Sequence, residues 1–255
     1  MNDNKLISII TVVYNSDSLI RQTIESVVCQ SNYAQIEYIV IDGNSKDQTI
    51  NIINEYSTFI DVLISENDLG IYDAMNKGLK YANGEWVLFL NAGDCLIPND
   101  IINIIKNNFN TIDEIIYGNI VVQHMNKNKR IKPASLFAFN YKMPFCHQAV
   151  LVKKILFTQY SIEFDTSYKV AADYKLFYTF YKKKCKFKYL DVDISNYDLT
   201  GQSFQNPFLY HSEVFKIINS KSSNIFTKYF KNSLFVLGNL KTFFYIIIKK
   251  NIFNN

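Results

Sequence analysis

Residues 6–13 read LISIITVV, an almost unbroken run of apolar and β-branched side chains. Such a run is typical of a strand that is buried on both faces of a parallel sheet. Residues 16–30 follow with apolar side chains at helical spacing, and Ser16 or Asp17 can cap that helix. Strand-like and helix-like segments then alternate over residues 36–42, 45–56, 61–66, 71–82 and 85–90. This order predicts an α/β fold with a mostly parallel sheet flanked by helices, in which ligands bind at the carboxyl ends of the strands.

After about residue 125 the alternation becomes less regular. The pattern there predicts a polar, basic loop or hairpin, a strand, an amphipathic helix and a further strand, at residues 123–133, 147–157, 171–184 and 186–194. No repeat with a period of 20–50 residues is visible. We therefore expect two halves of one domain followed by a tail, with bounds 1–125, 126–212 and 213–255.

The composition is that of a folded protein from a reducing compartment. With 255 residues and 48% hydrophobic content, the chain can bury a large core. Its four cysteines are far apart and form no CxxC pair, so we expect no zinc site. The first ten residues lack a basic region followed by an apolar stretch and a cleavage site, so we expect no export signal and a cytoplasmic location.

The formal net charge of +4 conceals an uneven distribution. Residues 214–255 contain seven lysines and no acidic residue, whereas acidic residues outnumber basic ones in the rest of the chain. The longest charge-free run of this tail, residues 232–240, is far shorter than the roughly 20 residues of a membrane-spanning helix. Two interpretations remain: an amphipathic helix lying on an anionic membrane, or a helix packed on the domain with its lysines in solvent. We expect no nucleic-acid partner.

Four consecutive strand ends finish in small, polar or acidic residues. They read VVYNSDS (12–18), IDGNSKD (41–47), SENDLG (65–70) and NAGD (91–94). Each alone is an ordinary loop. Because the carboxyl ends of parallel strands meet at one edge of a sheet, together they predict a polar crevice at that edge.

The second of these ends contains three residues of interest. The carboxylate of Asp42 can accept hydrogen bonds from a ribose diol or from a pyrimidine N–H, so we expect it to face a nucleotide. Ser45 and Asp47 are better explained as residues that support the N-terminus of the next helix. The chain has no GxGxxG and no GxxxxGK[ST] motif, so neither a dinucleotide fold nor a P-loop is indicated.

The helix predicted at residues 71–82 places Asp73, Asn76 and Lys77 on adjoining faces. Lys77 either forms a surface ion pair with Asp73 or lies near phosphate groups. Gly70, immediately before the helix, permits a close approach of the backbone to a ligand and favours the second interpretation.

Several motifs together resemble those of the family 2 glycosyltransferases. They are ISIITVVYN, YIVIDGNSKDQT, ISENDLGIYDAMNKG, GEWVLFLNAGD, PFCHQAV and AADYKLF, in this order, over roughly residues 5–200. The chain is most similar to the bacterial subgroup that builds lipopolysaccharide, capsule and other surface polysaccharides. The resemblance implies a GT-A fold, a nucleotide diphospho-sugar donor that is usually UDP-linked, Mg²⁺ or Mn²⁺ as cofactor, and transfer with inversion.

The resemblance also assigns roles to individual residues. Asp94 matches the last position of the family's acidic metal motif, although Asn91 and Gly93 stand where carboxylates often occur. One carboxylate suffices when diphosphate and water supply the remaining oxygen ligands. Asp173 matches the catalytic base, and His147 and Gln148 match a pair expected to bind the acceptor. The residues expected to bind the nucleotide-sugar are Val12, Tyr14, Asn15, Asp42, Asp73, Asn76, Lys77, Asn91, Ala92 and Gly93.

On this basis residues 1–125 are the nucleotide-sugar-binding half, residues 126–212 the acceptor and catalytic-base half, and residues 213–255 a basic, aromatic helical tail. The QxxRW motif of processive synthases is absent, which favours transfer of one sugar at a time. We expect a metal-dependent hexosyltransferase that acts on a saccharide in lipid-linked form, as a peripheral protein on the inner face of the cytoplasmic membrane. The alternatives are a nucleotidyltransferase and a non-catalytic saccharide-binding or scaffold protein.

Overall fold

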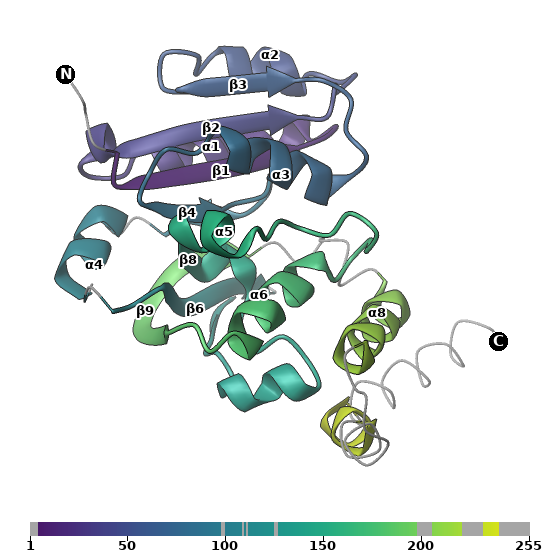
Figure 1. The fold of residues 1–255 in the computed structure, drawn as a ribbon. Helices are drawn as coiled ribbons and strands as arrows, with labels where there is room; N and C mark the ends of the chain where they lie inside the picture. The colour runs from purple at the N-terminus through teal and green to yellow at the C-terminus, as the bar shows by residue number, and fades with distance from the viewer. Residues whose placement is uncertain are drawn as a thin grey trace.

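The fold is described from a computed structural model, shown in Figure 1. The structure describes residues 5–97, 100–108, 110, 112–124, 127–197, 206–220 and 232–239. Among these residues, nine strands form one sheet, in which eight follow the order β3-β2-β1-β4-β8-β6-β9-β5 and β7 pairs with β6.

The first half of the sheet is parallel, as the alternation predicted. Its strands are β1 (Ile7–Val13), β2 (Ile36–Asp42), β3 (Val62–Ser65) and β4 (Trp86–Phe89). The helices between them are α1 (Asp17–Val28), α2 (Thr49–Asn54) and α3 (Ile71–Tyr81), and the short helix η1 (Tyr33–Gln35) precedes β2. Every residue of β1 is buried, because helices cover both faces of the sheet.

The second half makes the sheet mixed. Its strands are β5 (Cys95–Leu96), β6 (Ile115–His124), β7 (Lys127–Ile131), β8 (Val150–Lys153) and β9 (Phe187–Tyr197). Strand β8 joins the parallel half by pairing antiparallel to β4, and β6 then pairs antiparallel to β8 and parallel to β9. Within the segment predicted as a polar, basic loop or hairpin, residues 123–133, Lys127–Ile131 form β7, which pairs antiparallel to β6. Residues 125 and 126 lie outside the described residues.

The remaining helices belong mainly to this second half. They are α4 (Ile101–Asn108), η2 (Leu136–Asn140), η3 (His147–Ala149), α5 (Ile155–Tyr160), α6 (Ala172–Lys182) and α8 (Pro207–Asn219), followed by a helix over residues 232–239. The strand predicted at residues 147–157 is wrong at both ends, since only Val150–Lys153 is extended and α5 follows directly.

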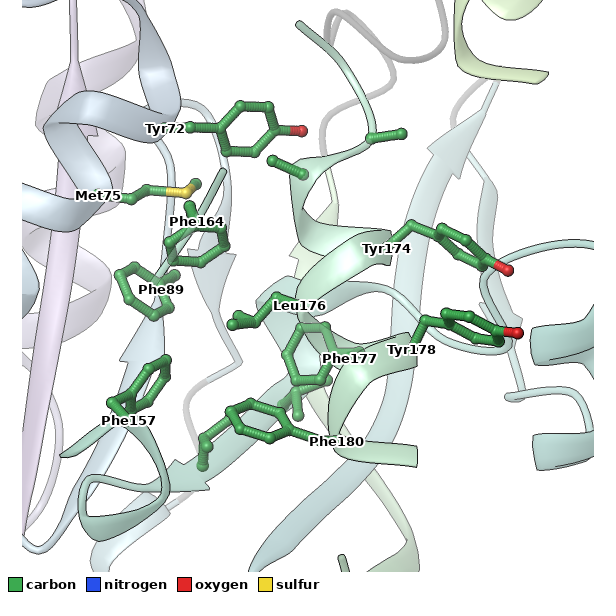
Figure 2. Close-up of a cluster of buried hydrophobic side chains, with 14 of the residues drawn as sticks. Tyr72, Met75, Phe89, Phe157, Phe164, Tyr174, Leu176, Phe177, Tyr178 and Phe180 are labelled. Atoms are coloured by element: carbon green, nitrogen blue, oxygen red, sulfur yellow. The ribbon is translucent and has the colours of Figure 1, made fainter. Parts of the chain in front are cut away.

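Two hydrophobic clusters lie on opposite faces of the sheet because side chains alternate along each strand. One cluster packs the sheet against α1, α2 and α4, and the other packs it against α3, α5, α6 and α8. In the second cluster Phe164 connects the two halves, as Figure 2 shows: its ring stacks on Tyr72 at 5.8 Å and meets the ring of Phe89 edge-on at 5.0 Å. These aromatic contacts pack the segment between α5 and α6 against α3 and β4.

The predicted tail does not begin at a structural boundary. Residue 213 lies within α8, whose side chains at Val214, Ile217 and Ile218 are buried in the second cluster. Asn239, in the last described helix, donates from Nδ2 to the carbonyl oxygen of Tyr141 at 2.9 Å. The remainder of the tail, residues 221–231 and 240–255, lies outside the described residues. No helix in the described part of the chain is long and apolar enough to span a membrane.

Candidate active site

A cavity of about 840 Å³ lies where the parallel half meets the second half. Its wall includes the ends of β1 and β4, the loop before α3, the segment from residue 142 to 148, and the start of α6. Asp94 and Asp173, the predicted metal ligand and the predicted base, both line this cavity. Three of the four strand ends predicted to form a crevice, at residues 12–18, 65–70 and 91–94, contribute to this cavity, and the one at residues 41–47 does not.

Asp94 is held by a tight turn after β4. Its N–H donates to the carbonyl oxygen of Asn91 at 3.0 Å, and Gly93 between them has φ +100°, a conformation that L side chains rarely adopt. The N–H of Gly93 donates to the hydroxyl of Thr23 on α1 at 2.9 Å. The turn is thus anchored to a neighbouring helix, and it presents a carboxylate that is only 3% exposed.

Gln148 supports the Asp94 carboxylate. Its Nε2 donates to Asp94 Oδ2 at 2.8 Å, and its Oε1 accepts from the thiol of Cys146 at 2.6 Å. Burial, followed by the negative charge of Asp94, raises the pKa of the Cys146 thiol well above its usual value, so the thiol stays protonated and donates. This donation fixes the orientation of the Gln148 amide, with its NH₂ group toward Asp94.

Asp173 lies in the first turn of α6 and has two side-chain partners. His147 Nδ1 lies 3.2 Å from Asp173 Oδ2, and the hydroxyl of Tyr72 donates to Asp173 Oδ1 at 3.3 Å. Burial, and after it the charge of Asp173, raises the pKa of Tyr72 well above its usual value, so the phenol remains a donor. Asn91 Nδ2 lies 3.4 Å from His147 Nε2, which favours the tautomer that carries its proton on Nδ1.

His147 and Gln148 therefore connect the two carboxylates. They are consecutive residues of η3, one bonded to Asp173 and the other to Asp94. Both also line the cavity, so their predicted contact with an acceptor stays a prediction. Their contacts with the two acids were not predicted.

Several predicted donor-binding residues line the cavity and others do not. Val12, Tyr14, Asn91 and Ala92 lie in its wall. Asn15 and Gly93 do not: Asn15 Oδ1 instead accepts from the N–H of Lys46 at 2.8 Å and connects two loops.

Asp42 is fully buried and is not part of the cavity wall. Its carboxylate accepts hydrogen bonds from the N–H and hydroxyl of Ser45 and from the hydroxyl of Ser65. In this structure the carboxylate joins the ends of β2 and β3, in contrast to the expectation that it faces a ligand.

The three polar residues of α3 that were predicted to bind the donor make contacts within the protein and do not line the cavity. Asn76 Nδ2 donates to the carbonyl oxygen of Phe164 at 2.8 Å, and Asn76 Oδ1 accepts from the N–H of Phe164 at 2.8 Å. Lys77 pairs with Glu66 at 2.9 Å and with Asp73 at 3.5 Å. None of Asp73, Asn76 and Lys77 lines the cavity, so the first interpretation of Lys77, an ion pair, is the one observed.

The cavity residues that were not predicted include Asp68, Tyr72 and Tyr210. Asp68 follows β3 in the motif ENDLG. Its position at the end of a third strand could have identified it as a cavity residue from the sequence. Gly43 makes room for it, because a Cβ at that position would lie 2.5 Å from Asp68 Oδ2. Tyr210 comes from α8, outside every motif, and nothing in the sequence indicates it.

The residues beside Asp94 fit a hard divalent cation that takes most of its ligands from a substrate. The described residues contain no group of three His, Cys, Asp or Glu side chains able to bind a metal without other ligands. Asn91 Oδ1, however, is buried without a hydrogen-bond partner in the described part of the chain, and Asn91 lines the same cavity as Asp94. Carboxylate and amide oxygens are ligands for Mg²⁺ or Mn²⁺, and phosphate oxygens complete such sites.

The sequence is similar to those of known proteins. The model of the family "Glycosyl transferase family 2" matches residues 8–173. The chain is 25% identical over 205 residues to a PGL/p-HBAD biosynthesis glycosyltransferase of Mycobacterium tuberculosis, covering 77% of this chain and 78% of that protein. It is 32% identical over 191 residues to an uncharacterised glycosyltransferase of Rickettsia prowazekii, covering 69% and 59%.

Solved structures share the fold. A structure of S. aureus TarS, residues 1–349, in complex with UDP is similar with a TM-score of 0.65 at 20% identity, covering 91% of this chain and 70% of that one. The mannosyltransferase PcManGT from Pyrobaculum calidifontis, in complex with GDP-Man and Mn²⁺, has a TM-score of 0.67 at 16% identity, covering 91% and 69%.

Proposed function

This chain belongs to glycosyltransferase family 2, and from that premise we propose that it is an inverting, non-processive enzyme that transfers one sugar from a UDP-sugar to a saccharide acceptor. The observation that carries the proposal is the placement of Asp94 and Asp173 in one cavity. Consecutive residues, His147 and Gln148, bond to them. An inverting transfer requires two groups acting on opposite sides of the anomeric carbon, one on the leaving group and one on the acceptor hydroxyl.

We assign the donor to the part of the cavity formed by the ends of β1 and β4. Val12, Tyr14, Asn91 and Ala92 line it, and Tyr14 offers an exposed ring on which a base can stack. Complexes of TarS with UDP and UDP-GlcNAc support a nucleotide-sugar donor.

Asp94, with the amide oxygen of Asn91, would hold the cofactor Mg²⁺ or Mn²⁺. A cation bound there would neutralise the charge of the departing diphosphate. The Mn²⁺ in the PcManGT complex supports this assignment. Gln148 keeps the Asp94 carboxylate in place through its hydrogen bond to Oδ2.

Asp173 is the proposed base. As the acceptor oxygen forms its bond to the anomeric carbon, the hydroxyl proton passes to a carboxylate oxygen of Asp173. The bond from the anomeric carbon to the diphosphate oxygen breaks, and that oxygen keeps the electron pair. His147 and Tyr72 hold one carboxylate oxygen each and orient the base in the cavity.

Release of UDP from a panel of UDP-sugars with Mn²⁺, in the presence of saccharide acceptors, tests the proposal. Asp94→Ala and Asp173→Asn are each expected to reduce kcat by about 100-fold or more. The first variant loses charge stabilisation of the leaving diphosphate, and the second loses the base. Asp173→Asn should still bind UDP. The matched control is Asp100→Asn, which changes a carboxylate that caps α4 outside the cavity.

Other outcomes would support the alternatives. UDP binding without release from any donor would indicate a saccharide-binding or scaffold protein. Pyrophosphate formation that depends on a nucleoside triphosphate would indicate a nucleotidyltransferase. Full activity of Asp173→Asn would remove Asp173 from the mechanism while leaving the donor site intact.

The acceptor proposal is a lipid-linked saccharide of bacterial surface polysaccharide synthesis, such as that of lipopolysaccharide or capsule, at the inner face of the cytoplasmic membrane. Large apolar side chains are exposed on α8 and on the helix over residues 232–239: Phe208, Leu209, Phe215, Val236 and Leu237. They adjoin the lysine-rich part of the sequence. Exposed apolar groups together with basic residues favour an anionic lipid surface.

A further inference from the structure

Helix α8 contacts the chain just before α6 through a buried carboxylate. Glu213, which is 9% exposed, accepts hydrogen bonds from three consecutive backbone N–H groups. Lys169 donates to Oε1 at 2.9 Å, and Val170 and Ala171 each donate to Oε2 at 3.0 Å. Figure 1 shows α8 beside the start of α6.

These three residues lead directly into the proposed catalytic helix. Ala171 is the N-cap residue of α6 and has no side-chain oxygen to cap it, and Asp173 is two residues further on. Helix N-termini leave backbone N–H groups without partners inside the helix, and a carboxylate placed there is favoured. Glu213 therefore caps the approach to α6 from a distance of more than 40 residues along the chain.

The same face of α8 contacts the segment that carries His147. Tyr210, one turn before Glu213, accepts at its hydroxyl oxygen from the N–H of Met143 at 3.3 Å. Burial, followed by the charge of Asp173, raises the pKa of Tyr210, which is consistent with a phenol close to the base. One helix thus holds both chain segments that form the pair of His147 and Asp173.

We propose that Glu213 is a positioning residue for the catalytic base, with α8 as part of the catalytic unit. This inference rests on the proposed function, because it takes Asp173 to be the base. Glu213 does not line the cavity and acts through the backbone of residues 169–171. Helix α8 also lies outside the segment matched by the family model, residues 8–173.

Glu213→Gln tests the proposal because it preserves the shape of the side chain while replacing one acceptor oxygen by a donor NH₂ group that faces N–H groups. The matched control is Glu37→Gln. Glu37 is 6% exposed, accepts from the hydroxyl of Ser8 and from the backbone and side chain of Asn83, and does not line the cavity. Both variants lose a comparable buried network.

We expect Glu213→Gln to lower kcat by about tenfold or more, because small displacements of a catalytic group are costly. The KM for the donor and the Kd for UDP should stay within about twofold of wild type, since the donor site is formed by other elements. Glu37→Gln should lower the Tm to a similar extent and keep the wild-type kcat. Hydrogen exchange at the N–H groups of residues 169–171 should accelerate in Glu213→Gln alone.

Faster exchange at residues 169–171 with an unchanged kcat would overturn the proposal and leave Glu213 as a structural cap. An equal loss of kcat in Glu37→Gln would also overturn it. If Glu213→Gln does not fold, Glu213→Asp, which keeps the charge but shortens the reach, gives the same comparison. Failure of the proposed function is recognised separately, because either the wild type would release no UDP or Asp173→Asn would retain full activity, whatever the Glu213 variants do.

Discussion

Asn76 illustrates how a polar residue near a ligand site can have a structural role. Both polar atoms of its side chain bond to the backbone of Phe164, whose ring lies between Tyr72 and Phe89 (Figure 2). Its position in the motif indicated nucleotide binding, because a sequence shows which polar groups are near a site but not which of them are already bonded.

Asn76→Ala is expected to lower the free energy of unfolding by about 1–3 kcal/mol, because two buried backbone groups of Phe164 lose their partner. The Kd for UDP should not change. Urea unfolding and a UDP titration measure the two effects, and Asn51→Ala, at an exposed position of α2, is the control. A weaker UDP affinity at unchanged stability would show that Asn76 contacts the donor.

The placement of Asp94 and Asp173 in one cavity was predictable from their motifs, but their hydrogen-bond partners were not. Asp94 and Gln148 are 54 residues apart in the sequence, and Asp173 and Tyr72 are 101 apart. Such contacts depend on how β4, η3 and α6 pack, and local periodicity contains no information about that packing.

At the scale of elements, the start of α6 is also held by an ion pair within its own half. Asp165, in the loop before α6, pairs with Lys175 on the helix. Partial burial opposes the ionisation of Asp165, but hydrogen bonds from Lys175 and Ser167 outweigh it and lower its pKa to about 2. A carboxyl group with a lowered folded-state pKa stabilises the fold above its unfolded-state pKa and loses that contribution as the pH falls.

Asp165→Asn should therefore reduce the free energy of unfolding at pH 7. The difference from wild type should shrink as the pH falls from about 4 to about 2, where the wild-type carboxylate becomes protonated. Urea unfolding at stepped pH values checks this. Glu163→Gln, at an exposed neighbouring position, serves as the control. If the difference in the free energy of unfolding between Asp165→Asn and wild type were as large at pH 2 as at pH 7, a lowered pKa of Asp165 would be contradicted.

The elements of the parallel half were predictable and β6 was not. Strands β1 to β4 are short, apolar and separated by amphipathic helices. The spacing of the apolar residues and the composition therefore indicate the same alternation of strands and helices. Strand β6 contains Gly118 and Asn119, which are poor strand formers, at an irregularity in its pairing with β9. A Cβ at Gly118 would lie 2.6 Å from the carbonyl oxygen of Val192, so glycine there permits the close approach of β9.

At the scale of the whole molecule, the α/β class was predictable but the mixed sheet was not. The antiparallel pairing of β4 with β8 joins segments more than 60 residues apart. It therefore lacks the regular strand–helix–strand pattern by which parallel pairing can be predicted from a sequence. For the tail at residues 213–255 the sequence left two interpretations open, a helix on a membrane or a helix packed on the domain, and α8, which includes its first residues, packs into the core. Whether such a helix packs on the domain depends on which of its faces is buried, and composition alone does not show that.

The full chain is expected to cosediment with vesicles containing anionic lipid more strongly than with neutral vesicles, and salt should weaken this binding. Replacing Phe208 and Leu209 by serine should reduce binding, because both are exposed apolar residues of α8. Phe59→Ser, which changes an exposed apolar residue of the other half, is the control. Equal binding to neutral vesicles, or none to either kind, would contradict the membrane proposal.

The adjacency of His147 and Gln148 has a consequence for how such an enzyme can diversify. One peptide unit, continuous with a strand of the central sheet, sets the spacing between the two acids. If the surrounding loops gain or lose residues, we expect the spacing between Asp94 and Asp173 to be preserved, because neither hydrogen bond depends on those loops. On the proposed function, a change of substrate would then require changes in the loops alone.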